Sequence, residues 1–335
     1  MAIPGTTIAS EAVHAIGMRL GQFFLAPGSA FSLASLAVTL AVFVVATTYR
    51  RHRRTVSLRL LRRVLLPRRL LGTASGRTDA AFALAAPTLT FFALGWALVS
   101  AEAVRGAVQP WLPAREAALL PGWVATGVAT VTLFVAVEFA YWLDHRLKHA
   151  IPLLWHFHKV HHQAESLSLL TDFRVHPVDT LIFANIAAAI LGTTQAVLAA
   201  SLGTEPTPLA IGGSNLLVLS TAAVLTHLQH SHLWITFGPR WGRWFLAPAH
   251  HQVHHSRDPR HFNRNMGSVL AIFDRMAGTF HQPSPRREVA RFGVEDGTPD
   301  PHGWRAALLD PFAAAMRPGD SSARPTASPS SSSAL

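Results

Sequence analysis

Five long stretches without a charged side chain dominate this sequence and limit the folds it can adopt. A helix needs about 20 apolar residues to cross a lipid bilayer, and each stretch is close to that length. They are Phe31–Thr48, Ala80–Ala101, Ala117–Val137, Thr180–Thr204 and Pro206–Thr226. Charged residues make up only 14% of the 335 residues, against about 25% in soluble domains. The sequence therefore predicts an all-α fold, a multi-pass transmembrane helical bundle.

The most basic segment predicts how these spans are oriented. Arg50–Arg69 holds nine Arg and no acidic residue, and such segments stay on the cytoplasmic side of a membrane. Its mixture of leucine and arginine suits a helix lying on anionic headgroups. Five crossings then place the N-terminus outside and everything from His227 onward inside. A re-entrant hairpin in place of the last two spans would return the chain to the same side of the membrane. We expect a multi-pass protein of a bacterial inner membrane.

The overall charge and the missing cysteine exclude other functions. The net charge is +11, but the basic residues flank the apolar stretches and no aromatic–basic binding module is visible, so nucleic acid is not an expected partner. The chain has no Cys, which excludes disulfides, thiolate metal sites and cysteine-bound iron–sulfur clusters. No cleavage site follows a basic start, so no cleaved signal peptide is expected.

Histidine is the residue type most suited to carry chemistry here, with 19 copies. One HxxxH pair directly follows the third span, and two HxxHH groups come later in the chain. Residues three or four apart share a helix face, so each group can direct several ring nitrogens at one centre. Near the end of the fifth span His230 is the preferred further ligand and His227 the second choice. The candidate metal ligands are His145, His149, His158, His161, His162, His227, His230, His251, His254 and His255.

This number of imidazoles is larger than the number of ligands that one metal ion binds. Structural zinc uses four protein ligands and catalytic zinc usually three, whereas imidazole also suits iron and copper. Two ions, each with four or five nitrogens and one open position, would use the whole set. A redox metal is favoured, because a pair of open positions can bind and reduce dioxygen and zinc cannot. Since the parity count puts every group on one side, we expect a cytoplasmic helical cap that holds a histidine-rich di-metal site.

The order of these groups resembles the fatty acid hydroxylase / sterol desaturase superfamily of membrane di-iron oxygenases. The resemblance runs from about Glu138 to Phe280 and includes DFRVHP (Asp172–Pro177) and FDRMAGTF (Phe273–Phe280). Phe273 stands where the family usually has Trp, which leaves the histidine groups intact. The resemblance implies two iron ions as the cofactor, with zinc able to replace them after overexpression.

The resemblance also implies a reaction. It is that of a membrane-bound di-iron oxygenase, which uses dioxygen and externally supplied electrons to hydroxylate an unactivated C–H bond of a fatty acyl, sterol or isoprenoid lipid. A lipid desaturase with the same site is one alternative, and a non-enzymatic membrane metal-binding or transport protein is another. Transporters place ligands at the bilayer midplane, whereas these histidines follow span ends. No nucleotide-binding glycine motif or fused haem domain is visible, so a separate electron carrier, ferredoxin-like or a haem protein, with its reductase is expected.

The chain divides into four expected regions. Residues 1–78 hold the first span and the Arg-rich region, 79–137 the second and third spans, 138–282 the hydroxylase-like catalytic domain with the last two spans, and 283–335 an extension whose tail from Ser321 is expected to be disordered. Near the ligands, carboxylates can accept the second N–H of an imidazole. The candidates for this role are Asp144, Glu138, Asp172, Asp179 and Asp274. His250 and His176 are expected outside the metal site, the first because it points away on its helix and the second because it orients its loop.

Overall fold

The computed structural model describes residues 20–50, 71–115, 117–294 and 301–317, together with His14, Gly17 and Met18. Two expectations concern residues that the structure does not describe, apart from Arg50, and they stay predictions. They are the interfacial helix over Arg50–Arg69 and the disordered tail from Ser321. In chain order the described elements are α2 (Leu33–Arg50), α5 (Ala74–Gly95), α6 (Ala101–Val108), η1 (Gln109–Trp111), α7 (Gly122–Ala150), α8 (Pro152–His162), η2 (Thr171–Phe173), α9 (Pro177–Leu202), β1 (Ala210–Ile211), β2 (Ser214–Asn215), α10 (Leu216–Val224), η3 (Thr226–Leu228), α11 (Gly238–Gly242), α12 (Pro248–His254), η4 (Pro259–His261), α13 (Ile272–Met276) and α14 (Trp304–Ala315).

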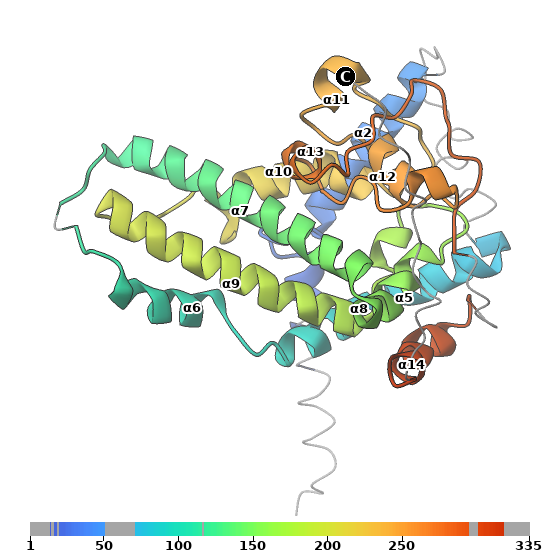
Figure 1. Cartoon of the computed structure of the whole chain (residues 1–335), viewed down its shortest axis with the longest axis horizontal. Coiled ribbons are helices and arrows are strands. Elements are labelled where there is room, and N and C mark those ends of the chain that lie inside the picture. Colours follow the sequence, from blue (N-terminus) through green and yellow to red (C-terminus); the bar gives the residue numbers. More distant parts are fainter. Residues whose placement is uncertain are drawn as a thin grey trace, which may run out of the picture.

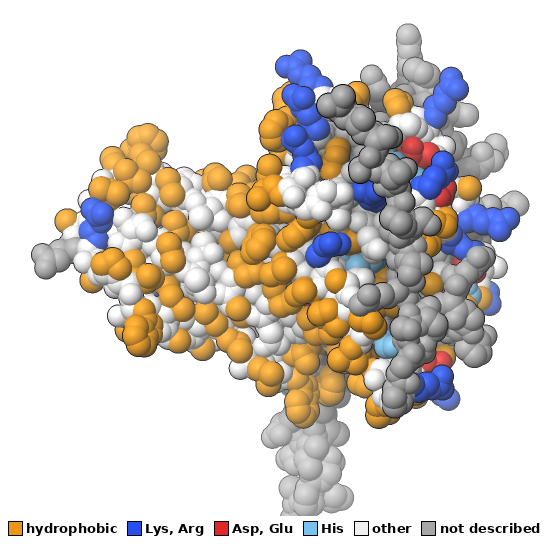
Figure 2. All heavy atoms as spheres, in the orientation of Figure 1, with side chains coloured by type: hydrophobic (Ala, Val, Ile, Leu, Met, Phe, Trp, Pro, Cys, Tyr) orange, Lys and Arg blue, Asp and Glu red, His pale blue; other side chains and the backbone are white. Residues whose placement is uncertain are grey.

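The molecule consists of an elongated body and a wider cap at one end (Figure 1). The long helices α7 and α9 pack along the body, and α6 packs on the outer half of α9. Helices α8, α12, α13 and α14 gather in the cap. Apolar side chains cover the body, whereas most Lys and Arg side chains lie over the cap (Figure 2). This division suits a protein whose body is embedded in lipid and whose cap is in water.

Three described helices, α5, α7 and α9, are long and apolar enough to cross a membrane. The third and fourth predicted spans correspond to α7 and α9, each an unbroken helix. The first corresponds to the shorter apolar helix α2. The mostly helical membrane architecture is therefore confirmed, while the number and direction of crossings stay predictions.

The second predicted span corresponds to α5, which is long and apolar enough to cross a membrane but ends before the apolar stretch does. Helix α5 ends at Gly95 and α6 begins at Ala101. Between them, the backbone N–H groups of Leu98 and Val99 donate to Oδ1 of Asn185 in α9, at 3.0 and 3.1 Å. Lipid cannot satisfy free backbone groups. Asn185, a polar residue inside an apolar helix, thus compensates for the break.

The fifth stretch also differs from the single long helix that was expected. It contains Pro206, Pro208 and the Gly-Gly pair 212–213, which interrupt a helix, and both glycines have positive φ. The chain instead forms the β1–β2 hairpin and the nine-residue helix α10. The side chain of Asn215 donates to the carbonyl of Thr130 in α7 at 2.8 Å, which fixes the hairpin on the body. From α10 the chain still returns to the cap.

Prolines set the geometry of the cap. Pro152 ends α7 because it cannot supply the next helical N–H, and it starts α8 as its first residue. Pro248 starts α12 in the same way. A buried ion pair fixes α8 against α5: Arg174 Nη1 lies 3.2 Å from Asp79 Oδ1, and Arg174 Nε donates to the carbonyl of Val160 at 2.8 Å. The two contacts of Arg174 thus join α5 to α8 in the interior of the cap.

Candidate metal centre

Nine histidines among the described residues converge where the body meets the cap. Two come from the end of α7, three from α8, one from the segment after η3, and three from α12 and the residue that follows it. They are His145, His149, His158, His161, His162, His230, His251, His254 and His255. Each is buried, with at most 7% of its surface exposed. The structure thus brings together nine of the ten predicted ligands.

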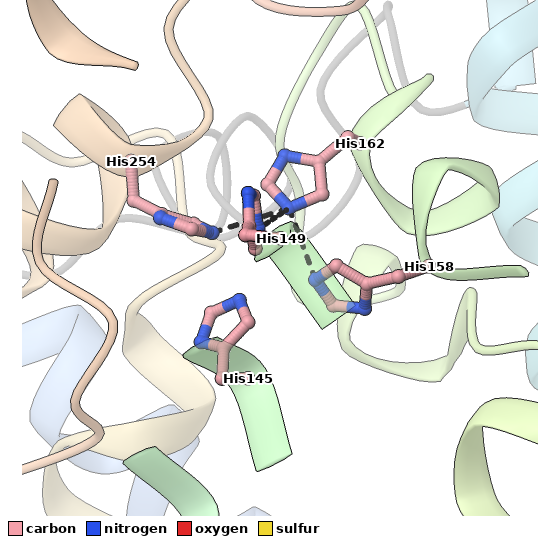
Figure 3. A group of neighbouring side chains, drawn as sticks. All are labelled: His145, His149, His158, His162 and His254. Atoms are coloured by element: carbon pink, nitrogen blue, oxygen red, sulfur yellow. Dashed lines mark hydrogen bonds between the residues drawn. The ribbon is translucent and has the colours of Figure 1, made fainter. Parts of the chain in front are cut away.

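The nine side chains form two groups, and within each group one nitrogen per ring lies within 4.8 Å of all the others. The first group is His145, His149, His158, His162 and His254, drawn in Figure 3. In it, Nε2 of His162 lies 3.2 Å from Nε2 of His149 and 3.1 Å from Nε2 of both His158 and His254. The first centre therefore draws on three separate helices.

The second group has four imidazoles, His161, His230, His251 and His255. Nε2 of His230 lies 3.0 Å from Nε2 of His161 and 2.9 Å from Nε2 of His251. Nε2 of His255 lies 3.0 Å from that of His251. The two groups adjoin, because the rings of His162 and His255 stack with centroids 4.5 Å apart.

This arrangement fits metal ions. Where Nδ1 donates to a neighbour, Nε2 carries only a lone pair, and several such lone pairs would repel one another without a cation between them. Metal–nitrogen bonds of about 2.0–2.1 Å place tetrahedral ligands about 3.3 Å apart, close to the spacings seen here. Nε2 of His145 is buried without a hydrogen-bond partner and faces the first group (Figure 3). Burial and the neighbouring imidazoles lower the pKa of His161, His162 and His255 well below the usual value, which keeps these rings neutral.

A carboxylate forms a hydrogen bond with one of the rings, and a second carboxylate forms a longer contact with another. Nδ1 of His158 lies 2.7 Å from Oδ2 of Asp179, and Nδ1 of His230 lies 3.3 Å from Oδ1 of Asp172. Burial alone would raise the pKa of Asp172, but the hydrogen bond from His227 and the nearby imidazoles hold that pKa below its usual range. A carboxylate that faces Nδ1 fixes the tautomer that leaves Nε2 free to bind metal.

Backbone carbonyls orient three other rings, a role that the sequence analysis assigned only to carboxylates. Nδ1 of His145 lies 2.8 Å from the carbonyl oxygen of Met266, and Nδ1 of His254 lies 2.9 Å from that of Arg264. Nδ1 of His161 lies 3.2 Å from the carbonyl oxygen of Arg174. Any residue offers a carbonyl, so no sequence signal marks these three.

The other three predicted carboxylates accept hydrogen bonds from backbone N–H groups or contact a cation. None of them contacts a ring of the two histidine groups. Glu138 Oε2 accepts the N–H groups of Val269 and Leu270 at 2.7 and 2.8 Å. Asp274 accepts the N–H groups of Met266 and Gly267, both at 2.8 Å. Together they fix the loop whose Met266 carbonyl faces His145.

Asp144, the last of these carboxylates, contacts a buried cation that the sequence analysis missed. Nζ of Lys148 lies 2.5 Å from Asp144 Oδ2 and also bonds to Asp179, the carboxylate that faces His158. Lys148 is only 3% exposed. The spacing of four between Asp144 and Lys148 at the end of an apolar stretch is the signal that could have revealed this pair.

His227, the second choice among the predicted ligands near the fifth span, lies outside both groups. Its Nδ1 lies 2.5 Å from Asp172 Oδ2, and its Nε2 lies 3.0 Å from the carbonyl oxygen of Ala30. Although burial opposes it, the hydrogen bond to Asp172 raises the pKa of His227. With both nitrogens engaged, His227 holds Asp172 in place, and of these two histidines only His230 belongs to the second group.

His250 and His176 also lie outside both groups, as expected. Nδ1 of His250 accepts the N–H of Ala247 at 2.9 Å and caps the start of α12. Burial lowers the pKa of His250 to about 4, so the ring stays a neutral acceptor. Nδ1 of His176 accepts the N–H of Val178 at 3.1 Å and caps the start of α9. Both histidines therefore support helices that border the centre.

Comparisons with known proteins identify a related segment. Residues 130–279 match the model of the fatty acid hydroxylase family. The ornithine lipid hydroxylase OlsE of Rhizobium tropici is 32% identical over 178 residues, which cover 53% of this chain and 48% of that protein. Alkylglycerol monooxygenases of Caenorhabditis elegans and Xenopus tropicalis are 31% and 28% identical over 43% and 48% of this chain, and 25% and 32% of theirs. The chain thus spans about half or less of the length of these relatives, and no solved structure matches it.

Proposed function

We propose, on the premise that residues 130–279 form a fatty acid hydroxylase domain, that this protein is a membrane-bound lipid hydroxylase with two iron ions. The family match confirms the resemblance seen in the sequence. The named relatives are a lipid hydroxylase and monooxygenases, which supports oxidoreductase activity. The observation that carries the proposal is the pair of adjoining, buried groups of five and four imidazoles.

Each group would hold one ion. Iron bound there would supply the binding and reduction of dioxygen that attack on an unactivated C–H bond requires. Both groups consist of imidazole alone, a ligand that also suits zinc and copper, so zinc can replace iron in overexpressed protein. The electrons are proposed to come from a separate carrier protein, ferredoxin-like or haem-containing, together with its reductase.

The chain's own residues prepare the site for this chemistry. Asp179 and Asp172 face the Nδ1 atoms of His158 and His230 and thereby direct Nε2 inward. Burial of all nine rings excludes bulk water, which protects reactive species from side reactions. Lys148 balances the charge of Asp179 inside this dry volume. The protein thus supplies position, dryness and fixed tautomers.

The position of the centre favours one class of lipid. The histidines of α7 lie near the cap end of that helix, beyond most of its apolar length. A carbon close to a lipid headgroup reaches such a site directly, whereas a carbon deep in an acyl chain requires the chain to fold back. We therefore propose as substrate a membrane lipid that is attacked near its headgroup. Ornithine lipids and alkylglycerols, named for the relatives, have polar headgroups of this kind.

The test compares lipid extracts by mass spectrometry from cells that express wild-type protein, His161→Ala, His254→Ala or His302→Ala. His161 and His254 each belong to one metal group, whereas His302 lies outside both. We expect one lipid to gain one oxygen atom with wild type and His302→Ala, and no such product with the other two. His250 is a poorer control, because it caps α12.

Other outcomes identify the alternatives. A loss of two hydrogens would make the protein a desaturase, and an unchanged lipid profile with metal bound would favour a non-enzymatic metal-binding protein. After a chelator has removed surface-bound metal, elemental analysis should find about two ions per chain, from the ligand count above. One ion per chain, or full occupancy in both ligand variants, would contradict the di-metal proposal.

A further inference from the structure

A second type of histidine cluster lies in the cap, beyond α12, and shares no residue with the nine-histidine centre. It consists of His261 at the end of η4, His281 after α13, and Glu288 in the segment that follows. One ligand atom from each of the three residues lies within 4.8 Å of the other two. Neither the family resemblance nor the proposed reaction assigns these residues a role.

The three side chains already face one another. Nε2 of His281 lies 2.8 Å from Oε1 of Glu288. The rings of His261 and His281 have centroids 5.1 Å apart and are inclined at 66°. Small side-chain movements would bring all three ligand atoms to the spacing of about 3.3 Å that a tetrahedral zinc ion imposes.

The backbone fixes the residues that carry these side chains. The N–H of His281 donates to Asn265 Oδ1 at 2.8 Å, and Asn265 Nδ2 donates to the carbonyl of His281 at 3.0 Å. Asn265 is 1% exposed and adopts a positive φ of 55°, a conformation that non-glycine residues seldom adopt. His261 Nδ1 lies 2.9 Å from Ser256 Oγ. Such preorganisation lowers the cost of binding an ion.

The cluster is open to solvent, unlike the main centre. The side chains of His281 and Glu288 are 31% and 25% exposed, whereas all nine histidines of the main centre are buried. His261 is buried at 4% exposure and closes the inner side. An ion at this position would therefore exchange with the surrounding solution and keep room for a water ligand.

We propose that His261, His281 and Glu288 bind one divalent transition-metal ion, with zinc preferred. Two imidazoles and one carboxylate form a ligand set that zinc uses together with water. Burial and the neighbouring His281 lower the pKa of His261, which leaves that ring neutral and able to bind. The ion would bind whether or not the chain hydroxylates lipid, because the two sites have separate ligands.

The site's position suggests a structural role. Glu288 immediately precedes Val289, and Val289 and Phe292 pack in one apolar core with Val253 of α12. An ion held by Glu288 and His261 would connect this segment to the loop that follows α12. It would thus fasten the outer wall of the cap behind the histidines of the main centre.

The experiment uses full-length protein in detergent, treated with EDTA to remove exchangeable metal and then titrated with zinc. Wild type is compared with Glu288→Gln, His281→Gln and the control Asp258→Asn, an acidic residue near His261 that pairs with Arg260. We expect wild type and Asp258→Asn to take up one more zinc ion per chain than the two cluster variants. Each cluster substitution should weaken this binding by at least about tenfold. Zinc should raise the melting temperature of wild type and Asp258→Asn only.

Two further measurements separate this site from the main centre and from misfolding. His161→Ala should still take up the exchangeable zinc ion, even where it loses metal from the main centre. In EDTA-treated wild type, one equivalent of cobalt(II) should give visible absorption that one equivalent of zinc removes. Equal zinc uptake by wild type and both cluster variants, or no zinc-sensitive cobalt absorption, would show that the three residues form only a hydrogen-bonded cluster.

Discussion

Asp172 joins two histidines whose roles differ. Its Oδ2 lies 2.5 Å from Nδ1 of His227, and its Oδ1 lies 3.3 Å from Nδ1 of His230. His227 is in turn anchored to the carbonyl of Ala30, before α2. One carboxylate oxygen is thus fixed to the scaffold, while the other faces a candidate metal ligand. The orientation of His230 therefore depends on residues that are far apart in the sequence.

This dependence gives a prediction for Asp172→Ala. Removing the carboxylate frees the ring of His230 and leaves His227 without its buried partner. Loss of such a partner typically lowers metal affinity about 10–100-fold, and we expect a loss of that order in the second metal group. Metal content measured at several free iron concentrations checks it, with Asp310→Ala, an exposed residue of α14, as control. Equal metal content in the two variants would contradict the role given to Asp172.

At the scale of residues, the sequence predicted the grouped histidines better than it predicted the carboxylates and carbonyls that face their rings. The HxxxH and HxxHH spacings identified eight of the nine residues that the structure groups together, because helix periodicity alone brings such residues to one face. The ninth, His230, was predicted from its place near the end of the fifth stretch. Of the five predicted carboxylates, only Asp172 and Asp179 face ligand rings. Three other rings use backbone carbonyls at Nδ1, and the positions of these carbonyls depend on the tertiary fold.

At the scale of elements, length and apolar composition predicted α5, α7 and α9 but missed the breaks in the second and fifth stretches. Polar residues inside the spans were the available signal. Asn185 Oδ1 accepts the N–H of Leu98 between α5 and α6, and Thr130 Oγ1 accepts the N–H of Leu209 beside the hairpin. A single Asn or Thr is compatible with an intact apolar helix, so only the partner segment reveals its role. The break after α5 therefore could not be placed from the sequence, whereas the prolines and the Gly-Gly pair of the fifth stretch were a signal for the other break.

The packing of α6 against α9 gives a prediction at this scale. A Cβ at Gly192 would lie 2.3 Å from the carbonyl oxygen of Ala101 and 2.7 Å from Cβ of Val104. Gly192→Ala should therefore push α6 away and destabilise the body by about 1–3 kcal/mol, the usual cost of overpacking. Thermal unfolding in detergent measures the loss. Gly127→Ala in α7, whose Cβ would meet no atom within 4 Å, is the control, and an equal melting temperature for the two variants would contradict this account.

The whole molecule separates an apolar body from a charged cap, and this separation bears on the supply of electrons. The main centre is buried where the body meets the cap, and Lys and Arg side chains gather over the cap (Figure 2). The sequence shows no nicotinamide or flavin motif and no Cys for an iron–sulfur cluster. We expect purified protein with iron, dioxygen, lipid and NADH to form no product until a carrier and its reductase are added. Product formation without them, measured by mass spectrometry, would mean that the chain holds its own redox cofactor.

The same asymmetry predicts the orientation of the protein in the membrane. Basic residues concentrate on the cap (Figure 2), and basic segments remain in the cytoplasm. The last described helix, α14, packs on α8 in that cap, so a reporter fused after Leu335 should lie on the cap side. We expect green fluorescent protein fused there to fluoresce and alkaline phosphatase fused there to be inactive. A phosphatase inserted at Pro113, between α6 and α7 at the far end of the body, is the matched control and should be active. Phosphatase activity after Leu335 would place the metal centre on the outer side of the membrane and exclude a cytoplasmic electron carrier.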